Sequence, residues 1–108
     1  MAKWQAARID GNQPELVEYI RGHGATFQHT HTVPGALDGI IGFHGIDQRV
    51  EIKDPTQPKK KKLLTPLEVE VFDTWKGRKP VVIFTREDCK KLLQRLMKEA
   101  VARNKLEL

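Results

Sequence analysis

A symmetric arrangement of charged residues about His44 and Gly45 constrains this chain more than any other feature. Apolar and polar residues alternate on both sides of this pair, which predicts an antiparallel β-hairpin with His44 and Gly45 as its two-residue turn. Glycine at the second turn position suits the positive φ that such a tight turn requires. In this register Asp38 directly faces Glu51.

The two faces of the predicted hairpin differ in polarity. One face is mostly apolar and is expected to join the core; it carries Leu37, Gly39, Ile41, Phe43, Ile46, Gln48, Val50 and Ile52. The other face gathers the charges; it carries Asp38, Ile40, Gly42, Asp47, Arg49, Glu51 and Lys53. Because a slip of one residue would turn the acids toward the core, the pattern fixes the register.

Asp38, Glu51 and Lys53 are predicted to converge on the polar face. Directly opposed residues of an antiparallel pair have Cβ atoms about 4.5–5.5 Å apart. Two carboxylates at that separation repel unless a cation lies between them or one of them takes a proton. Lys53 lies two residues after Glu51 and points to the same face. The combination favours a Mg²⁺ site for phosphate chemistry, and the alternative is an exposed sheet face with a cross-strand salt bridge.

The local signals predict the element order helix, three strands, helix, strand, helix. Asn12 and Pro14 favour a helix start, and Thr65 to Glu68 form a capping box with proline at the first helical position. The expected ranges are a helix over 13–21, a strand over 25–32, the hairpin over 36–53, a helix over 65–76, a strand over 80–84 and a last helix from 85. The apolar face of the last helix would carry Cys89, Leu92, Leu93, Leu96, Met97 and Ala100.

These elements predict one α/β domain over residues 1–108, with a small mixed β-sheet flanked by helices in the order αβββαβα. The step from the hairpin through the 65–76 helix to the 80–84 strand implies a crossover and parallel pairing. Residues 1–11 are expected to form a loose N-terminal segment, and residues 54–63 a basic loop.

The composition favours a cytoplasmic protein. The chain has a single cysteine, Cys89, which excludes an internal disulfide and fits a reducing compartment. No apolar run approaches the roughly 20 residues of a membrane span, and no apolar segment of a signal peptide follows the N-terminus. Complete absence of serine excludes a Ser-His-Asp triad.

The basic charge is concentrated in one place. Without the run from Lys59 to Lys62, the net charge falls from +5 to +1. A local basic stretch suits a polyanion that is touched at one place, and its alternative is a solvated loop.

The first helix adds a further acid. Its apolar positions direct Glu18 to solvent and place Glu15 at the boundary, where it can lean over the edge of the sheet. The alternative for Glu15 is an acid favoured by the dipole of the helix N-terminus.

Taken together, these residues resemble the PD-(D/E)XK nuclease superfamily, and within it the small VRR-NUC branch common in phage genomes. The stretches that carry the resemblance are Asn12 to Glu15, Thr32 to Asp38, Val50 to Asp54, Leu64 to Pro66, Phe72 to Trp75 and Pro80 to Val82. The chain departs from the pattern in having Leu37 where the motif has proline and in lacking a Val-Arg-Arg triplet.

The resemblance implies a restriction-endonuclease-like core and a nuclease that hydrolyses DNA with Mg²⁺, for which Mn²⁺ would substitute. Asp38 and Glu51 would supply carboxylates to the metal, the Ile52 backbone carbonyl a further ligand, and Glu15 a contact through water. Lys53 would orient the attacking water and neutralise a phosphate oxygen. Relatives of this type include nucleases that act on branched DNA, which suggests junction or flap cleavage.

The expected partners are DNA, a second copy of the chain and other phage proteins in a bacterial host cytoplasm, with no membrane. Lys59, Lys60, Lys61, Lys62, Lys3 and Arg8 are the candidate contacts to the DNA backbone. A homodimer is expected because a domain of this size spans little DNA. Two alternatives are a non-catalytic nucleic-acid-binding module on the same fold and a nuclease subunit that needs a phage partner.

The remaining candidates have weaker chemical signatures. His29 and His31 alternate along a strand, but without a third histidine or a nearby cysteine they make a poor zinc site. Cys89 is expected to be a small buried residue, and Trp75 is expected to pack in the core. The capping box is the explanation for Glu68.

Overall fold

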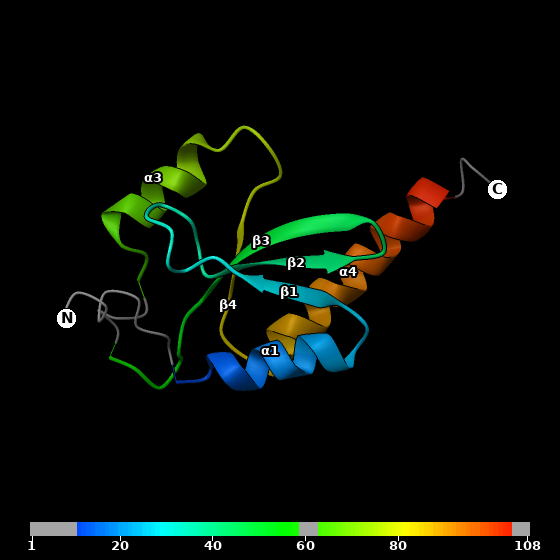
Figure 1. The fold of residues 1–108 in the computed structure, drawn as a ribbon, viewed down its shortest axis with the longest axis horizontal. Coiled ribbons are helices and arrows are strands. Elements are labelled where there is room, and N and C mark those ends of the chain that lie inside the picture. Colours follow the sequence, from blue (N-terminus) through cyan, green and yellow to red (C-terminus); the bar gives the residue numbers. More distant parts are fainter. Residues whose placement is uncertain (1–10, 59–62, 105–108) are drawn as a thin grey trace.

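The computed structural model describes residues 11–58 and 63–104. Within these ranges the chain forms a small α/β fold whose element order agrees with the expected one (Figure 1). The elements are α1 (Gln13–Gly22), β1 (Thr26–His29), β2 (Gly39–Phe43), β3 (Ile46–Ile52), α3 (Pro66–Thr74), β4 (Val81–Ile83) and α4 (Arg86–Asn104). Lys3, Arg8 and the run from Lys59 to Lys62 lie outside the described residues.

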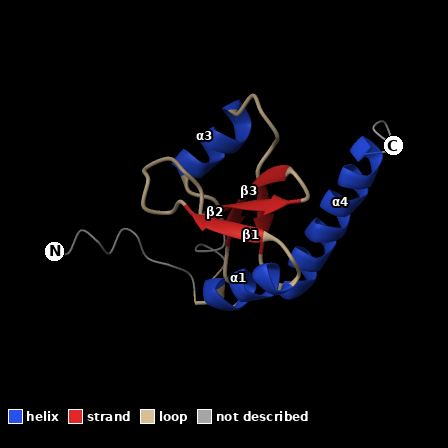
Figure 2. Ribbon diagram, turned by 45° about the vertical axis from the view of Figure 1, so that its right-hand side comes forward, coloured by secondary structure: helices blue, strands red, loops and turns tan. Residues whose placement is uncertain are grey.

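The four strands form one mixed sheet in the order β1-β2-β3-β4. The two hairpin-type pairings are antiparallel, and β3 and β4 are parallel as the crossover predicted. Helices α1 and α4 contact each other and pack against one face of the sheet, whereas α3 lies apart from them (Figure 2). No described helix is long and apolar enough to cross a bilayer.

The predicted hairpin register is confirmed. Strands β2 and β3 pair from Phe43 with Ile46 to Gly39 with Val50. Both turn residues have positive φ, 52° at His44 and 82° at Gly45, as a two-residue hairpin turn requires. All eight residues of the expected core face are buried: Leu37, Gly39, Ile41, Phe43, Ile46, Gln48, Val50 and Ile52.

The core lies between this face and helices α1 and α4. Leu16, Val17 and Ile20 of α1 meet one side of α4 within it. The buried residues of α4 are those predicted for its apolar face, except Met97. Met97 is 39% exposed, while the other five residues are buried. Met97 instead lines an open hollow between α1, α4 and the end of β2.

Helix α3 lies away from α1 and α4, reaches the end of β3 through the ion pair of Glu68 with Lys53, and contributes no buried residue. The capping box of Thr65 and Glu68 is formed in full. Trp75 follows α3 and is 45% exposed, which corrects the expectation of a core tryptophan. Its ring instead lies 4.2 Å from the guanidinium carbon of Arg49, a cation–π contact on the polar face.

Candidate active site

Asp38 lies immediately before β2, at the point where the chain enters this strand. Its backbone carbonyl accepts a hydrogen bond from the Thr30 amide (2.9 Å), and its side-chain Oδ2 accepts one from the Ile52 amide (2.7 Å). The pairing of β2 with β3 ends at Gly39 and Val50, so the Ile52 amide has no backbone acceptor on β2. The Asp38 carboxylate takes the place of that acceptor. Gly39 follows, and a Cβ there would lie 2.3 Å from the Phe27 ring, so only glycine fits this approach.

The Ile52 carbonyl is directed toward the same edge as Asp38. The N–H and C=O groups of one strand residue point to the same side of the strand, and the Ile52 N–H points at Asp38. The Lys53 amide points the other way, to the Ile83 carbonyl at 3.1 Å. The Ile52 carbonyl is therefore placed where it can share a ligand with the Asp38 carboxylate.

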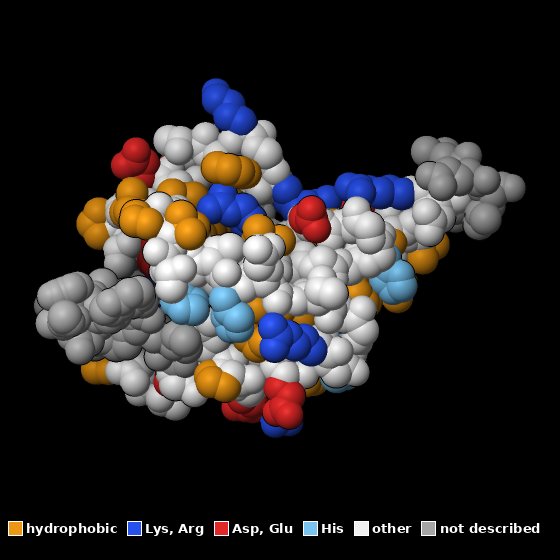
Figure 3. All heavy atoms as spheres, in the orientation of Figure 1, with side chains coloured by type: hydrophobic (Ala, Val, Ile, Leu, Met, Phe, Trp, Pro, Cys, Tyr) orange, Lys and Arg blue, Asp and Glu red, His pale blue; other side chains and the backbone are white. Residues whose placement is uncertain are grey.

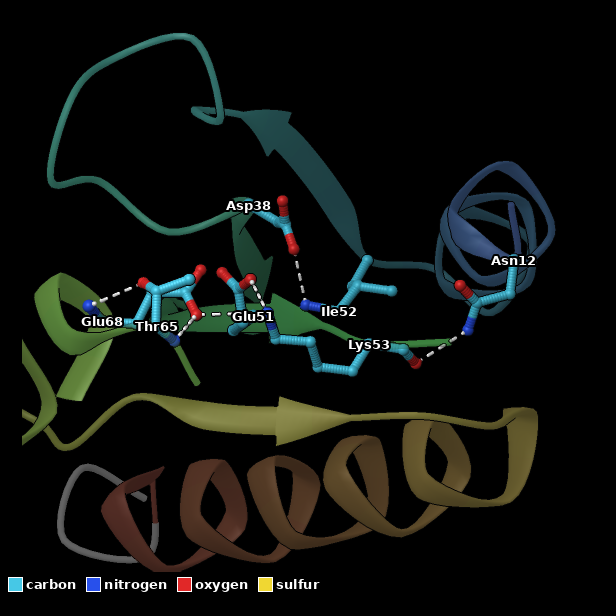
Figure 4. Close-up of polar contacts among 7 residues, drawn as sticks. All are labelled: Asn12, Asp38, Glu51, Ile52, Lys53, Thr65 and Glu68. Atoms are coloured by element: carbon cyan, nitrogen blue, oxygen red, sulfur yellow. Dashed lines mark hydrogen bonds and ion pairs between the residues drawn. The ribbon is translucent and has the colours of Figure 1, made fainter. Parts of the chain in front are cut away.

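Glu51 and Lys53 project together from the end of β3 and are almost fully buried, with 5% and 7% of their surface exposed (Figure 4). The Lys53 Nζ lies 3.4 Å from Glu51 Oε2 and 3.1 Å from Glu68 Oε1. Burial at this level excludes the alternative of an exposed sheet face. The pair is covered by α3, which brings Glu68 across the lysine.

This packing of acids changes the protonation of Glu51. Burial raises its pKa first of all, and the nearby Glu68 and Asp38 carboxylates raise it further, to about 9. The ammonium of Lys53 opposes this shift without cancelling it. The raised pKa favours the protonated form of Glu51 at neutral pH when no metal cation is present.

The neighbouring groups respond to the same environment. Burial raises the pKa of Asp38, although the hydrogen bonds from the Ile52 amide and from Glu51 oppose the shift. Burial alone would lower the pKa of Lys53, but the carboxylates of Glu51 and Glu68 leave it raised. Lys53 therefore stays charged at neutral pH.

Glu68 is a member of this group that the sequence did not reveal. Its Oε1 accepts hydrogen bonds from the Thr65 amide (2.9 Å) and pairs with Lys53. Burial alone would raise its pKa, yet hydrogen bonds from Glu51, Thr65 and Lys53 hold it below its usual value. In the sequence, Glu68 is part of a capping box, and this role alone accounts for a glutamate at that position. No sequence pattern indicated a contact with Lys53.

We expect Glu68→Gln to lower the pKa of Glu51. The substitution removes the charge of Glu68, which together with its hydrogen bond helps to raise that pKa. The amide can keep the capping contact to Thr65, so the fold should survive. Carboxyl NMR titration of wild type and variant measures the shift, and an unchanged or higher Glu51 pKa would show that Glu68 does not control this site.

Glu15 is placed elsewhere. Its side chain is 53% exposed and accepts a hydrogen bond from Arg86 Nε at 2.8 Å, at the start of α4. No contact between described residues joins it to Asp38, Glu51 or Lys53. An exposed ion pair of this kind contributes roughly 0–1 kcal/mol, so Glu15 is free to exchange Arg86 for another cation.

Asn12 connects α1 to the site in an unexpected way. Its side chain does not cap the helix but donates to the Lys53 carbonyl (3.1 Å) and the Phe84 carbonyl (2.9 Å), as Figure 4 shows for Lys53. One amide thereby joins the ends of the parallel strands β3 and β4. This contact brings the first turn of α1, and with it Glu15, to the end of the sheet where Lys53 lies.

The other candidates have structural roles. Burial raises the pKa of the Cys89 thiol to about 11, so it is not a thiolate nucleophile at neutral pH. His29 contacts the Gln13 amide nitrogen at 3.3 Å, and its ring meets His31 edge to face with centroids 5.6 Å apart. Burial, His31 and Arg21 lower the pKa of His29.

Comparison of the chain with protein families, with curated proteins and with solved structures gives no match. The geometry of the site is therefore the basis for any functional proposal.

Proposed function

We propose that this protein is a Mg²⁺-dependent nuclease that hydrolyses phosphodiester bonds in DNA, on a restriction-endonuclease-like core of the PD-(D/E)XK type. The observation that carries the proposal is the buried pair of Glu51 and Lys53, whose charged groups lie 3.4 Å apart at the end of β3. Asp38 lies beside them and accepts the amide of Ile52, the residue between the two. Acids that share a buried site need a cation or a proton, and a lysine beside them suits a substrate phosphate.

The donor set suits Mg²⁺. In the described part of the chain, no group of three or more histidine, cysteine, aspartate or glutamate side chains is arranged to hold a metal ion. Asp38 and Glu51 with the Ile52 carbonyl would form a partial oxygen shell, and Mg²⁺ usually takes one or two carboxylates and completes its shell with water and substrate phosphate. Burial and the neighbouring carboxylates raise the pKa of Glu51, and such an ion would neutralise the negative charge that these carboxylates crowd together.

The residues of the site divide the work between them. A bound Mg²⁺ would supply Lewis acidity toward the phosphate and lower the pKa of a bound water. Lys53 neutralises a phosphate oxygen and orients the attacking water, for which it must leave Glu68 or Glu51. Asp38 keeps its orientation through the Ile52 amide, and Glu15 joins the site through water once Arg86 releases it.

The substrate side of the proposal follows from the same chemistry. Binding to the DNA backbone would depend strongly on salt and little on sequence. Lys59 to Lys62 fall between β3 and α3 in the sequence and are the first candidates for backbone contact, with Lys3 and Arg8 in support. A homodimer would allow both strands of a junction or flap to be cut.

A nuclease assay on linear and branched DNA tests the proposal. Wild-type protein should cut with Mg²⁺ or Mn²⁺ and stop when a chelator is added. Lys53→Ala should reduce the rate by about 10²–10⁴-fold, because a positioned charge at the phosphate is lost. Wild-type rates in Lys53→Ala would show that the chemistry occurs elsewhere or comes from a contaminant.

One observation favours a second candidate, a non-catalytic nucleic-acid-binding module. Lys53 already has two carboxylate partners, as it would in a purely structural ion-pair network. Thermal unfolding in a metal titration separates the two. A nuclease should gain stability with Mg²⁺ or Mn²⁺, because an ion that binds only the folded state stabilises it, whereas a binding module should show no change.

A further inference from the structure

A hollow lies at the opposite end of β2 from Asp38. It has a volume of about 630 Å³ and is formed by α1, α4 and the end of β2. Phe43 ends β2 and Asp38 precedes it, so the two sites are separated by roughly 17 Å of strand. The lining is mostly apolar and includes Tyr19, Phe43, Leu93 and Met97.

The apolar lining continues along α4 beyond the hollow. Leu93, Met97 and Val101 follow one another at intervals of four residues, so they form one row along the helix. Met97 is 39% exposed and Val101 51% exposed. Figures 1 and 2 show that this end of α4 extends past the β2–β3 turn, where no other described element covers it. Leu93 is buried at the floor of the hollow, so the exposed part of the row is Met97 and Val101, about one helical turn long.

A second row beside it carries positive charge. Lys90 and Lys98 line the hollow, and neither forms an ion pair with a described residue. Two acids of α4 have other partners: Asp88 accepts from the Phe84 and Thr85 amides, and Glu99 pairs with arginines. Lys90 and Lys98 therefore place two cations without ion-pair partners among the described residues on the rim of the apolar surface, and Figure 3 shows that other Lys and Arg side chains are spread over the visible face of the molecule.

We propose that this surface, made of Leu93, Met97 and Val101 with the flanking Lys90 and Lys98, binds an acidic amphipathic helix of a partner protein. Apolar side chains four residues apart match the spacing of a helix laid alongside α4, and acidic residues on its flanks would pair with the two lysines. A symmetric contact between two copies would bring these lysines together, which disfavours a second copy. The apolar lining disfavours the DNA backbone. This inference does not rest on the proposed nuclease activity.

Fluorescence anisotropy with the full chain tests the inference. The probe is a labelled synthetic helix with leucines on one face and glutamates elsewhere, beside a scrambled peptide of the same composition and a version with lysine in place of glutamate. The acidic amphipathic peptide should bind at least about tenfold more tightly than either control, since tenfold corresponds to one well-placed charge pair. Equal binding of the scrambled peptide would overturn the proposal.

Charge reversal makes the test specific to this face. Lys90→Glu with Lys98→Glu should weaken the acidic peptide by at least about tenfold and allow the lysine peptide to bind. The matched control is Lys91→Glu with Arg95→Glu, which makes the same charge change on the side of α4 that faces β4. Equal loss in the control would overturn the proposal in favour of non-specific attraction.

Two further outcomes would also overturn it. Self-association that Met97→Glu abolishes, measured by light scattering, would assign the surface to a second copy of the chain. Loss of DNA binding in the Lys90 and Lys98 variant would assign it to nucleic acid. Metal-dependent cleavage should be unchanged in that variant, because both lysines lie far from Lys53.

Discussion

Asp38→Asn should abolish Mg²⁺-dependent cleavage while leaving the metal-free protein folded. The asparagine side-chain oxygen can still accept the Ile52 amide, which Asp38 Oδ2 accepts at 2.7 Å, so the end of β2 should keep its place. The charge that would hold the cation is lost. We expect the rate to fall by about 10²–10³-fold or more, the scale of removing one electrostatic contributor from an active site. Cleavage of a branched DNA substrate measures the effect.

Two matched variants interpret this result. Asp38→Ala removes the acceptor as well, which leaves the Ile52 amide unpaired and should cost about 1–3 kcal/mol of stability in addition to activity. Asp47→Asn makes the same chemical change at an exposed position of the same hairpin and should cut like wild type. If Asp38→Asn cuts at the wild-type rate, Asp38 does not hold the metal.

Glu51→Gln should stabilise the metal-free protein at alkaline pH and abolish cleavage. The pKa of Glu51 is about 9 in the folded protein, above the usual glutamate value of 4.5. Between these two values the folded state binds more protons than the unfolded state, so stability falls as the pH rises from about 5 to 9. A neutral glutamine removes this loss. We expect a gain of about 1–3 kcal/mol at pH 9, or roughly 4–8 °C in Tm per kcal/mol.

Thermal unfolding from pH 5 to pH 9 in chelator measures the effect. Wild-type Tm should fall with pH, and the fall should be smaller in Glu51→Gln. Added Mg²⁺ should restore the wild type at high pH, because the cation replaces the proton as the partner of Glu51, and it should leave the variant unchanged. A variant with the same pH profile as wild type would show that Glu51 is already ionised without metal.

The expected gain in stability and loss of cleavage in Glu51→Gln together bear on the role of Glu51. A residue kept only for structure should not destabilise the fold when it ionises. Glu51 is expected to do so because burial raises its pKa and the Glu68 and Asp38 carboxylates raise it further. The expected trade of stability for activity is common where function needs charges that the fold alone would exclude.

The hairpin was the part of the fold most accessible to sequence reasoning. Side chains alternate with period two, and a turn at His44 and Gly45 allows one register, so the face that each residue joins is fixed by its neighbours in the chain. The capping box at Thr65 was also predictable, because it depends only on residues within one turn of the helix start. The helix and strand order followed from such signals, and only the ends moved, as at β1, which stops at His29 because the chain turns toward Asp38.

The partners of the charged residues were not accessible in this way. Glu68 reaches Lys53 because the crossover lays α3 on the polar face, and Glu15 turns to Arg86 because α1 and α4 meet at their starts. The Asn12 side chain does not cap α1 and instead donates hydrogen bonds at the ends of β3 and β4. Met97 and Trp75 carried apolar side chains that the sequence assigned to a core whose extent it did not define.

The sequence by itself determined that Asp38, Glu51 and Lys53 share one end of a hairpin, because periodicity and turn geometry act between near neighbours. Only the tertiary structure decided that Glu51 and Lys53 are buried, that Glu68 of α3 joins them, and that this environment raises the pKa of Glu51. The physical reason is that desolvation and charge pairing depend on which distant segments pack together, and one chain's local pattern is compatible with several such packings.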